Sequence, residues 1–322
     1  MKVFETLPDP FDDQLCGATY LGNSLHLLDG IPDNSVDLVL TSPPFALTRK
    51  KAYGNEEEAE YINWLLPFAE KVKRVLKPTG SFVLDLGGAY LPGVPVRSIY
   101  QFELLVRFCK ELGFFLAQEF YHYNPSRLPA PAEWVNVRRC RVKDSVNTVW
   151  WLSKTEYPNA DNRKVLKEYS ASMKSLLKNG YKAKMRPSGH DISTKFSRDN
   201  GGAVPPNVIG IDEGSNFLSI ANTESNSHYI RRCREEGIAP HPARFPAFFA
   251  EYFIKFLTEP GDIVVDIFAG SNTTGYVAEK LGRKWISFEM LEEYIRGSRL
   301  RFEDLQPWDI DPEDLDGLFE VS

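Results

Sequence analysis

The sequence has little cysteine and no long apolar run. Only 4 cysteines occur in 322 residues, and neighbouring cysteines lie at least 31 positions apart. This spacing excludes a Cys-x-x-Cys metal or redox motif, and it is typical of reduced, structural thiols in a cytoplasmic protein. No apolar run approaches the roughly 18 residues of a membrane span, so we expect no membrane association. Residues 1–10 lack the features of a signal peptide, and none is expected.

The residues that are present predict an α/β protein. Hydrophobic residues make up 43% and charged residues 25% of the chain, which fits one large globular domain with a smaller insertion. Apolar periodicity predicts alternating strands and helices over 1–155 and again over 241–305. Between them, 156–240 is polar and rich in Pro, Asn and Ser, and 306–322 is an acidic tail.

The predicted elements of the first half are specific. Helices are expected at 61–75 and about 98–112, a turn at 77–80, and strands at 36–40, 81–86, 114–121 and 147–152.

A loop with two prolines is the most informative feature. Thr41-Ser-Pro-Pro-Phe45 directly follows the apolar strand 36–40. Prolines end a strand because they donate no N–H, and their loop then lies at the carboxyl end of the strand, where open α/β sheets bind ligands. The Ser42 hydroxyl, the Pro43 carbonyl and the Phe45 ring could together hold a planar amine. The alternative is a proline-stiffened turn with a core Phe.

A predicted βαβ unit at 263–289 is the second feature. It contains a strand at 263–268, a turn at 269–272, a helix at 273–281 and a strand at 285–289. Glu289 follows Asp266 by 23 positions, near the offset of about 20 at which an acid meets ribose hydroxyls. The turn lacks the pattern Gly-x-Gly-x-x-Gly, so it fits a nucleoside without phosphates, such as S-adenosylmethionine, better than a dinucleotide. Alternatively, Glu289 is a surface charge at the strand end.

Together the motifs resemble those of the β-group amino-DNA methyltransferases, in which an S/D-P-P-F/Y loop precedes an F-x-G loop. The resemblance covers nearly the whole chain, including 20–24, 81–88 and His241–Pro246. It is strongest to the cytosine-N4 enzymes of restriction–modification systems, of the Pvu type, because Ser-Pro-Pro usually accompanies cytosine N4. No cysteine follows a proline, so the nucleophile of cytosine-C5 methyltransferases is missing. Asn23 stands where members often carry Asp.

The resemblance implies a Rossmann-like S-adenosylmethionine-dependent methyltransferase sheet with a smaller, irregular target-recognition region at 156–240. It implies S-adenosyl-L-methionine as cofactor, double-stranded DNA as partner, and methyl transfer to N4 of a flipped-out cytosine. It further suggests CAGCTG as the recognition sequence, a separately acting restriction endonuclease, and a monomer or weak dimer. No metal is expected, since His241 has no partner ligand near it in sequence.

The expected site has a catalytic and a cofactor part. Catalysis is assigned to Ser42, Pro43, Pro44 and Phe45, with Asp85 as acid or base; Asp85 could instead hold a loop. His122 is a second candidate base, although such a histidine is more often structural. The residues expected to bind the cofactor are Asn23, Phe245, Asp266, Phe268, Gly270, Ser271, Thr273, Thr274, Glu289 and Met290.

The charge distribution predicts a DNA-binding segment. The chain has a net charge of −6, yet residues 127–195 contain 15 Lys and Arg against 6 Asp and Glu. A basic segment in an acidic chain is expected where phosphates are neutralised, although it could also be an ordinary solvated face. The candidates are Arg127, Arg138, Arg139 and Lys143 for the DNA cleft, and Arg186, His190 and Lys195 for base edges.

Three alternatives remain at this stage. An adenine-N6 methyltransferase needs the same hydrogen bonds to its amine, so Ser42 disfavours it only statistically. A DNA-binding module with a decayed cofactor site is disfavoured by the joint presence of both motifs. A dinucleotide-dependent dehydrogenase is disfavoured by the missing second glycine.

Overall fold

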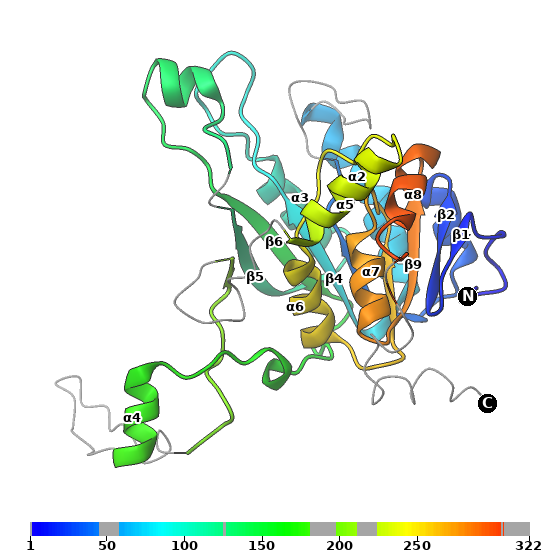
Figure 1. Cartoon of the computed structure of the whole chain (residues 1–322). Coiled ribbons are helices and arrows are strands. Elements are labelled where there is room, and N and C mark those ends of the chain that lie inside the picture. Colours follow the sequence, from blue (N-terminus) through cyan, green and yellow to red (C-terminus); the bar gives the residue numbers. More distant parts are fainter. Residues whose placement is uncertain are drawn as a thin grey trace.

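The centre of the molecule is a mixed β-sheet. The computed structural model describes residues 2–44, 58–124, 127–180, 198–210, 224–303 and 305. In these ranges the strand order is β1-β2-β9-β8-β3-β4-β6-β5-β7 (Figure 1). The strands are Asp12–Asp13 (β1), Gly17–Leu21 (β2), Val36–Thr41 (β3), Leu76–Leu86 (β4), Phe115–Tyr123 (β5), Val146–Ser153 (β6), Val208–Ile209 (β7), Ile263–Asp266 (β8) and Lys284–Glu289 (β9).

Helices flank the sheet on both faces. The α-helices are Ser24–Leu27 (α1), Glu58–Val75 (α2), Tyr100–Lys110 (α3), Ala171–Asn179 (α4), Glu224–Glu235 (α5), Ala247–Leu257 (α6), Thr273–Lys280 (α7) and Glu292–Arg299 (α8). Shorter helical turns are Leu28–Gly30 (η1), Glu133–Val137 (η2, a π-helix) and Asn162–Val165 (η3). Of the helices in the described ranges, none is long and apolar enough to cross a membrane.

The strand connections create a switch point between β8 and β3. β2, β9, β8, β3 and β4 run parallel, whereas β6 pairs antiparallel with both β4 and β5. The chain passes from β8 through α7 to β9 in one direction, and from β3 through α2 to β4 in the other. The loops that follow β8 and β3 therefore diverge from one position, where open α/β sheets bind their ligands.

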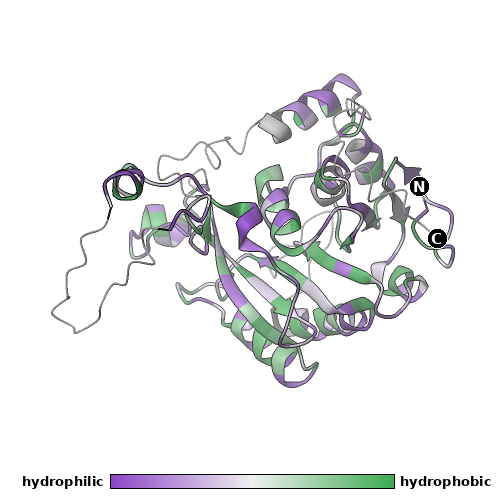
Figure 2. Cartoon of the chain, turned by 90° about the horizontal axis from the view of Figure 1, so that it is seen from below, coloured by the Kyte–Doolittle hydropathy of each residue, from purple (hydrophilic) through white to green (hydrophobic). Residues whose placement is uncertain are grey.

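Two hydrophobic cores cover the two faces of this sheet. α2 and α3 contribute Leu65, Phe68 and Leu104 to one core, and α6 and α7 contribute Phe253 and Val277 to the other. Figure 2 shows hydrophobic residues concentrated on the central strands. Burial on both faces explains the nearly continuous apolar runs that predicted these strands. The predicted α/β sheet is confirmed.

The predicted turn at 77–80 is a bulge within β4. Pairing with β3 moves from Val36↔Leu76 directly to Leu38↔Ser81. Gly80 fits the crowded position, because a Cβ there would lie 2.9 Å from the carbonyl oxygen of Val36. The turn residues are therefore absorbed as an irregularity of one long strand.

The region 156–240 contains elements that the sequence did not predict. α4 and α5 lie within it, and β7 pairs with β5 at the edge of the sheet. α5 is mostly polar and buries Tyr229 and Cys233 against Leu300, so it offers too few apolar positions for a helical period to stand out.

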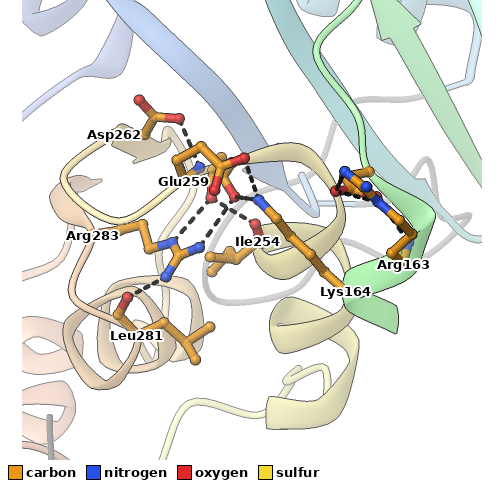
Figure 3. Close-up of polar contacts among 9 residues, drawn as sticks. Arg163, Lys164, Ile254, Glu259, Asp262, Leu281 and Arg283 are labelled. Carbon is orange, nitrogen blue, oxygen red and sulfur yellow. Dashed lines mark hydrogen bonds and ion pairs between the residues drawn. The ribbon is translucent and has the colours of Figure 1, made fainter. Parts of the chain in front are cut away.

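The start of this region is fixed to the main domain by polar contacts (Figure 3). Lys164 pairs with Glu259 and donates to the carbonyl of Thr258 at 3.1 Å. The Arg283 guanidinium donates to the same carbonyl at 3.1 Å. These contacts hold η3 against the end of α6, so the polar region begins from a defined position.

Two projections extend from the β5 side of the sheet (Figure 1). One, here called the finger, comprises residues 127–145 and contains η2; the other contains α4. The ion pair of Arg97 with Asp144 and the hydrogen bond of Arg141 Nε to Pro95 O, 3.0 Å, brace the finger against the loop before α3. Cys140 on the finger is exposed, so the expectation of structural cysteines is wrong at that position.

Candidate active site

Asp266 joins the two loops at the switch point. Its Oδ1 accepts from Thr41 Oγ1 at 2.6 Å and from the backbone N–H of Phe268 at 3.0 Å, while Oδ2 accepts from Thr274 Oγ1 at 2.7 Å. Burial raises the pKa of this carboxyl, and the hydrogen bonds oppose the rise. Asp266 thus fixes the proline loop relative to the Gly270 loop.

In the Gly270 loop, backbone conformation and packing both favour glycine. Gly270 has φ +52°, and a Cβ there would lie 2.9 Å from Cε1 of His241. The His241 ring is held edge-on to Tyr294, with ring centroids 4.4 Å apart. The segment His241–Pro246 therefore lies over the loop, and its Phe245 packs on Phe249 at 5.2 Å between centroids.

Glu289 is integrated into the same loop. Its Oε2 accepts from the N–H of Gly270 at 2.9 Å, and its Oε1 accepts from the N–H groups of Met290 and Leu291 at 2.8 and 2.9 Å. Desolvation is the main cause that raises the pKa of Glu289. These contacts argue against a freely solvated surface charge.

The remaining predicted cofactor residues lie around this loop. Asn23 follows β2, next to the end of β9, and caps α1 by accepting from the N–H of Leu25 at 2.9 Å. Phe268 is half-buried and packs on Trp64 and Phe68 of α2, with ring centroids 5.6 and 5.0 Å apart. Met290 is 64% exposed.

The hydroxyls of the loop have partners inside the protein. Ser271, Thr273 and Thr274 are all buried. Thr274 donates to Asp266, and Ser271 Oγ lies 3.3 Å from Thr273 Oγ1. Buried Arg301, which the sequence did not single out, donates to the carbonyl and hydroxyl of Ser271 at 2.7 and 3.1 Å.

The proline loop and β4 bring together a group of polar side chains around Asp85, here called the pocket, beside the switch point. Ser42 Oγ lies 3.4 Å from Asp85 Oδ2 and 3.3 Å from the Asp85 carbonyl. Asn147 Nδ2 contacts the same carboxylate oxygen at 3.5 Å. Asp85 is only 3% exposed, and burial raises its pKa to about 7. Pro43 and Pro44 follow Ser42, whereas Phe45 lies outside the described residues.

His122 shares the pocket with Asp85. Its Nδ1 lies 4.0 Å from Asp85 Oδ2, and the ring packs on Phe249 at 4.9 Å between centroids. Neither ring nitrogen has a hydrogen-bond partner among the described residues. Desolvation lowers the pKa of His122 to about 4, so the imidazole is neutral near pH 7.

Asn147 and Arg127 complete the pocket. Asn147 pairs with His122 across β5 and β6, and its Oδ1 accepts from Arg127 Nη1 at 2.8 Å. Asn147 was not predicted; its position at the start of a strand gave no signal for a site. Arg127, predicted as a DNA contact, is thereby placed at the edge of the pocket.

The other predicted DNA-binding residues divide into two groups. Arg138, Arg139 and Lys143 are exposed on the finger. Arg138 pairs with Glu133 at 2.8 Å and lies over the Trp134 ring. Arg186, His190 and Lys195 lie outside the described residues. Within the described ranges, no group of three or more His, Cys, Asp or Glu could hold a metal ion.

The divergent crossovers, the acid that ends β9 and the Ser-Pro-Pro loop after β3 define a Rossmann-like methyltransferase. The family model for DNA methylases, N6_N4_Mtase, matches residues 36–299, and the chain belongs to this family.

The chain is also similar to individual DNA methyltransferases within this family. The chain is 58% identical over 291 residues to the type II methyltransferase M.PvuII of Proteus hauseri, covering 89% of this chain and 84% of that protein. A solved structure of PvuII DNA methyltransferase, described as cytosine-N4-specific, matches with a TM-score of 0.71 and 49% identity over 94% of both chains. M.BglII of Bacillus subtilis is 29% identical, covering 90% of this chain and 69% of that protein.

Proposed function

We propose that the protein is a site-specific DNA methyltransferase that uses S-adenosyl-L-methionine to methylate the exocyclic N4 of cytosine in duplex DNA. The observation that carries this proposal is that Asp266 accepts hydrogen bonds both from Thr41, next to Ser42, and from Thr274, which follows the Gly270 turn. This link supports an amine-binding role for the proline loop beside a nucleoside-binding role for the Gly270 loop. The similarity to M.PvuII and to the cytosine-N4-specific structure supports it.

The residues present fit the cofactor. Gly270 leaves room for close backbone approach, and Glu289 keeps lone pairs for ribose hydroxyls because each carboxylate oxygen can accept more than one bond. Phe268 and Met290 would flank the adenine, beside Asn23. Ser271, Thr273 and Thr274 would place the start of α7 toward the methionine carboxylate, with Phe245 as a wall. When bound, S-adenosylmethionine supplies an electrophilic methyl group.

The pocket residues would prepare the target amine. The cytosine N4 is a weak nucleophile because its lone pair is delocalised into the ring. Acceptance of its N–H bonds by Ser42 Oγ and the Pro43 carbonyl would favour a tetrahedral nitrogen and fix its direction. Asp85, 3.4 Å from Ser42, would take the proton that the amine loses on gaining a methyl group. Phe45 would stack on the flipped base.

The DNA would lie against the finger, with Arg138, Arg139 and Lys143 near phosphates. The polar region that includes Arg186, His190 and Lys195 would read base edges. By the family resemblance, we propose CAGCTG as the site, a cytoplasmic monomer or weak dimer as the active form, and a separate endonuclease as its counterpart.

Methyl transfer to defined duplexes tests the proposal. Incubation with S-adenosylmethionine labelled in the methyl group should label a CAGCTG duplex and leave a duplex with the same bases in scrambled order nearly unlabelled. Labelling of both duplexes equally would reject the site, and labelling of neither duplex nor of plasmid DNA would reject the activity.

A further inference from the structure

Leu128 is an apolar side chain in an unusually exposed position. It is 79% exposed, and among the leucines that the structure describes none is more exposed. It stands at the start of the finger, whose surface also carries Arg and Lys residues and two exposed valines, Val137 (69%) and Val142 (86%). A single exposed leucine needs no explanation by itself. Whether Leu128 has a functional role is therefore judged from its location relative to the pocket.

The preceding residue fixes that location. Arg127 donates from Nη1 to Asn147 Oδ1 at 2.8 Å, and Asn147 contacts Asp85 beside Ser42. The Arg127 carbonyl accepts from Lys143 Nζ at 3.4 Å, which ties this limb of the finger to the returning one. Leu128 therefore stands one residue beyond a side chain anchored in the pocket, and its own side chain is in solvent.

The backbone at Leu128 is stiff. Pro129 follows directly and Pro131 two residues later. A residue before proline is largely restricted to extended conformations, and proline fixes its own φ. Little conformational freedom is then left to lose when the side chain enters another molecule.

From this placement, and resting on the proposed function, we propose that Leu128 is the wedge that enters the duplex as the target cytosine leaves it. Asp85 is buried and Ser42 only partly exposed, so a paired base cannot reach them and must rotate out. Its departure exposes the faces of the neighbouring bases. An apolar side chain inserted there replaces the missing stacking surface, as wedge residues do in proteins that unstack DNA.

Single-turnover methylation of two duplexes tests the wedge. Both carry the site that the wild-type protein methylates; in one the target cytosine is paired with guanine, and in the other it faces an abasic position. We expect Leu128→Ala to slow methylation of the paired duplex by about tenfold or more, because the opened state loses its stabilising contact. On the abasic duplex the variant should stay within about twofold of wild type, since little pairing remains to be broken.

Two further variants serve as controls: one keeps an apolar side chain at position 128, and the other changes a different exposed apolar side chain on the finger. Leu128→Met keeps a long apolar side chain and should retain the wild-type rate on both duplexes. Val142→Ala changes a side chain that is 86% exposed on the returning limb, beside residues that contact the loop before α3, and should also match wild type.

The outcomes separate the wedge from the proposed function. The wedge is rejected if Leu128→Ala matches wild type on the paired duplex, slows both duplexes equally, or is no slower than Val142→Ala. If the wild-type protein methylates no DNA at all, the proposed function fails and the wedge fails with it.

Discussion

At the scale of single residues, the pocket contains two buried ionisable groups, of which His122 is neutral near pH 7 and Asp85 is about half protonated. Asp85 and His122 lie 4.0 Å apart, and burial moves their pKa values in opposite directions, to about 7 and about 4. A carboxyl with such a pKa can accept a proton and release it again near neutral pH, which general acid–base chemistry needs.

This pair predicts a pH dependence of stability. The folded-state pKa of Asp85 lies above its unfolded value of 3.8. The contribution of Asp85 to the free energy of unfolding is therefore fully present below pH 3.8, and it is lost as pH rises toward 7. The folded-state pKa of His122 lies below its unfolded value of 6.5, so the contribution of His122 to the free energy of unfolding is lost as pH falls from 6.5 to about 4. Asp85→Asn should remove the loss of stability that accompanies ionisation of Asp85. The free energy of unfolding of this variant, relative to that of wild type, should rise by about 1–4 kcal/mol between pH 4 and pH 8.

Urea unfolding at several pH values measures this difference. Glu293→Gln is the control, because Glu293 is exposed on α8, away from the pocket. A profile of Asp85→Asn parallel to that of wild type would contradict the burial of a protonated carboxyl.

Ser42 and Glu289 should have separable roles. Ser42→Ala should reduce turnover strongly and leave cofactor affinity near normal, because within the described residues the side-chain hydrogen bonds of Ser42 go to Asp85. Glu289→Ala should weaken S-adenosylmethionine binding by about 1–3 kcal/mol, since it removes an acceptor that also organises the Gly270 loop. Titration calorimetry measures both affinities, with exposed Glu293→Ala as control. Equal reductions of affinity in the Ser42 and Glu289 variants would overturn the assignment of the two loops.

At the scale of elements, the sequence predicted best where burial imposes a pattern. The apolar runs of β3 and β8 and the amphipathic α2 were predicted because each packs against a core. α5 was missed because two buried side chains do not make a helical period. The contacts of Asn147 and Arg301 could not be predicted, since their partners lie 62 and 30 positions away in the chain.

Arg301 should control the shape of the Gly270 loop. Arg301→Met would leave the Ser271 carbonyl without this donor in a buried site, and should lower the free energy of unfolding by about 1–3 kcal/mol and weaken cofactor binding. Arg299→Met, at an exposed position on α8, should change neither. Thermal unfolding with and without S-adenosylmethionine tests both effects; a wild-type ligand response in Arg301→Met would contradict this role.

The finger should supply affinity for DNA of any sequence. Replacing Arg138, Arg139 and Lys143 together by glutamine should weaken binding to specific and random duplexes alike. It should also flatten the salt dependence by about one unit of slope for each phosphate that is no longer neutralised. The matched control replaces exposed Lys280, Arg296 and Arg299 on α7 and α8. DNA binding measured across a range of salt concentrations tests this role. If the salt dependence of the triple variant has the same slope as that of wild type, the finger is an ordinary solvated surface.

At the scale of the whole molecule, the charge distribution and the sheet have different roles. The net charge of −6 coexists with a local excess of nine positive charges over residues 127–195, so the rest of the chain carries −15. Such an asymmetry should orient the polyanion toward the finger and the α4 projection, which extend from the same side of the sheet (Figure 1). The sheet itself holds the proline loop and the Gly270 loop in fixed register at its switch point.

Identification of the methylated nucleoside tests the central claim most directly. Duplex DNA is incubated with the purified protein and S-adenosylmethionine, digested to nucleosides and analysed by mass spectrometry. We predict N4-methylcytosine in the wild-type reaction and its near absence with Ser42→Ala. Recovery of N6-methyladenine or 5-methylcytosine alone would contradict the assignment of the Ser42 loop to the amine of cytosine.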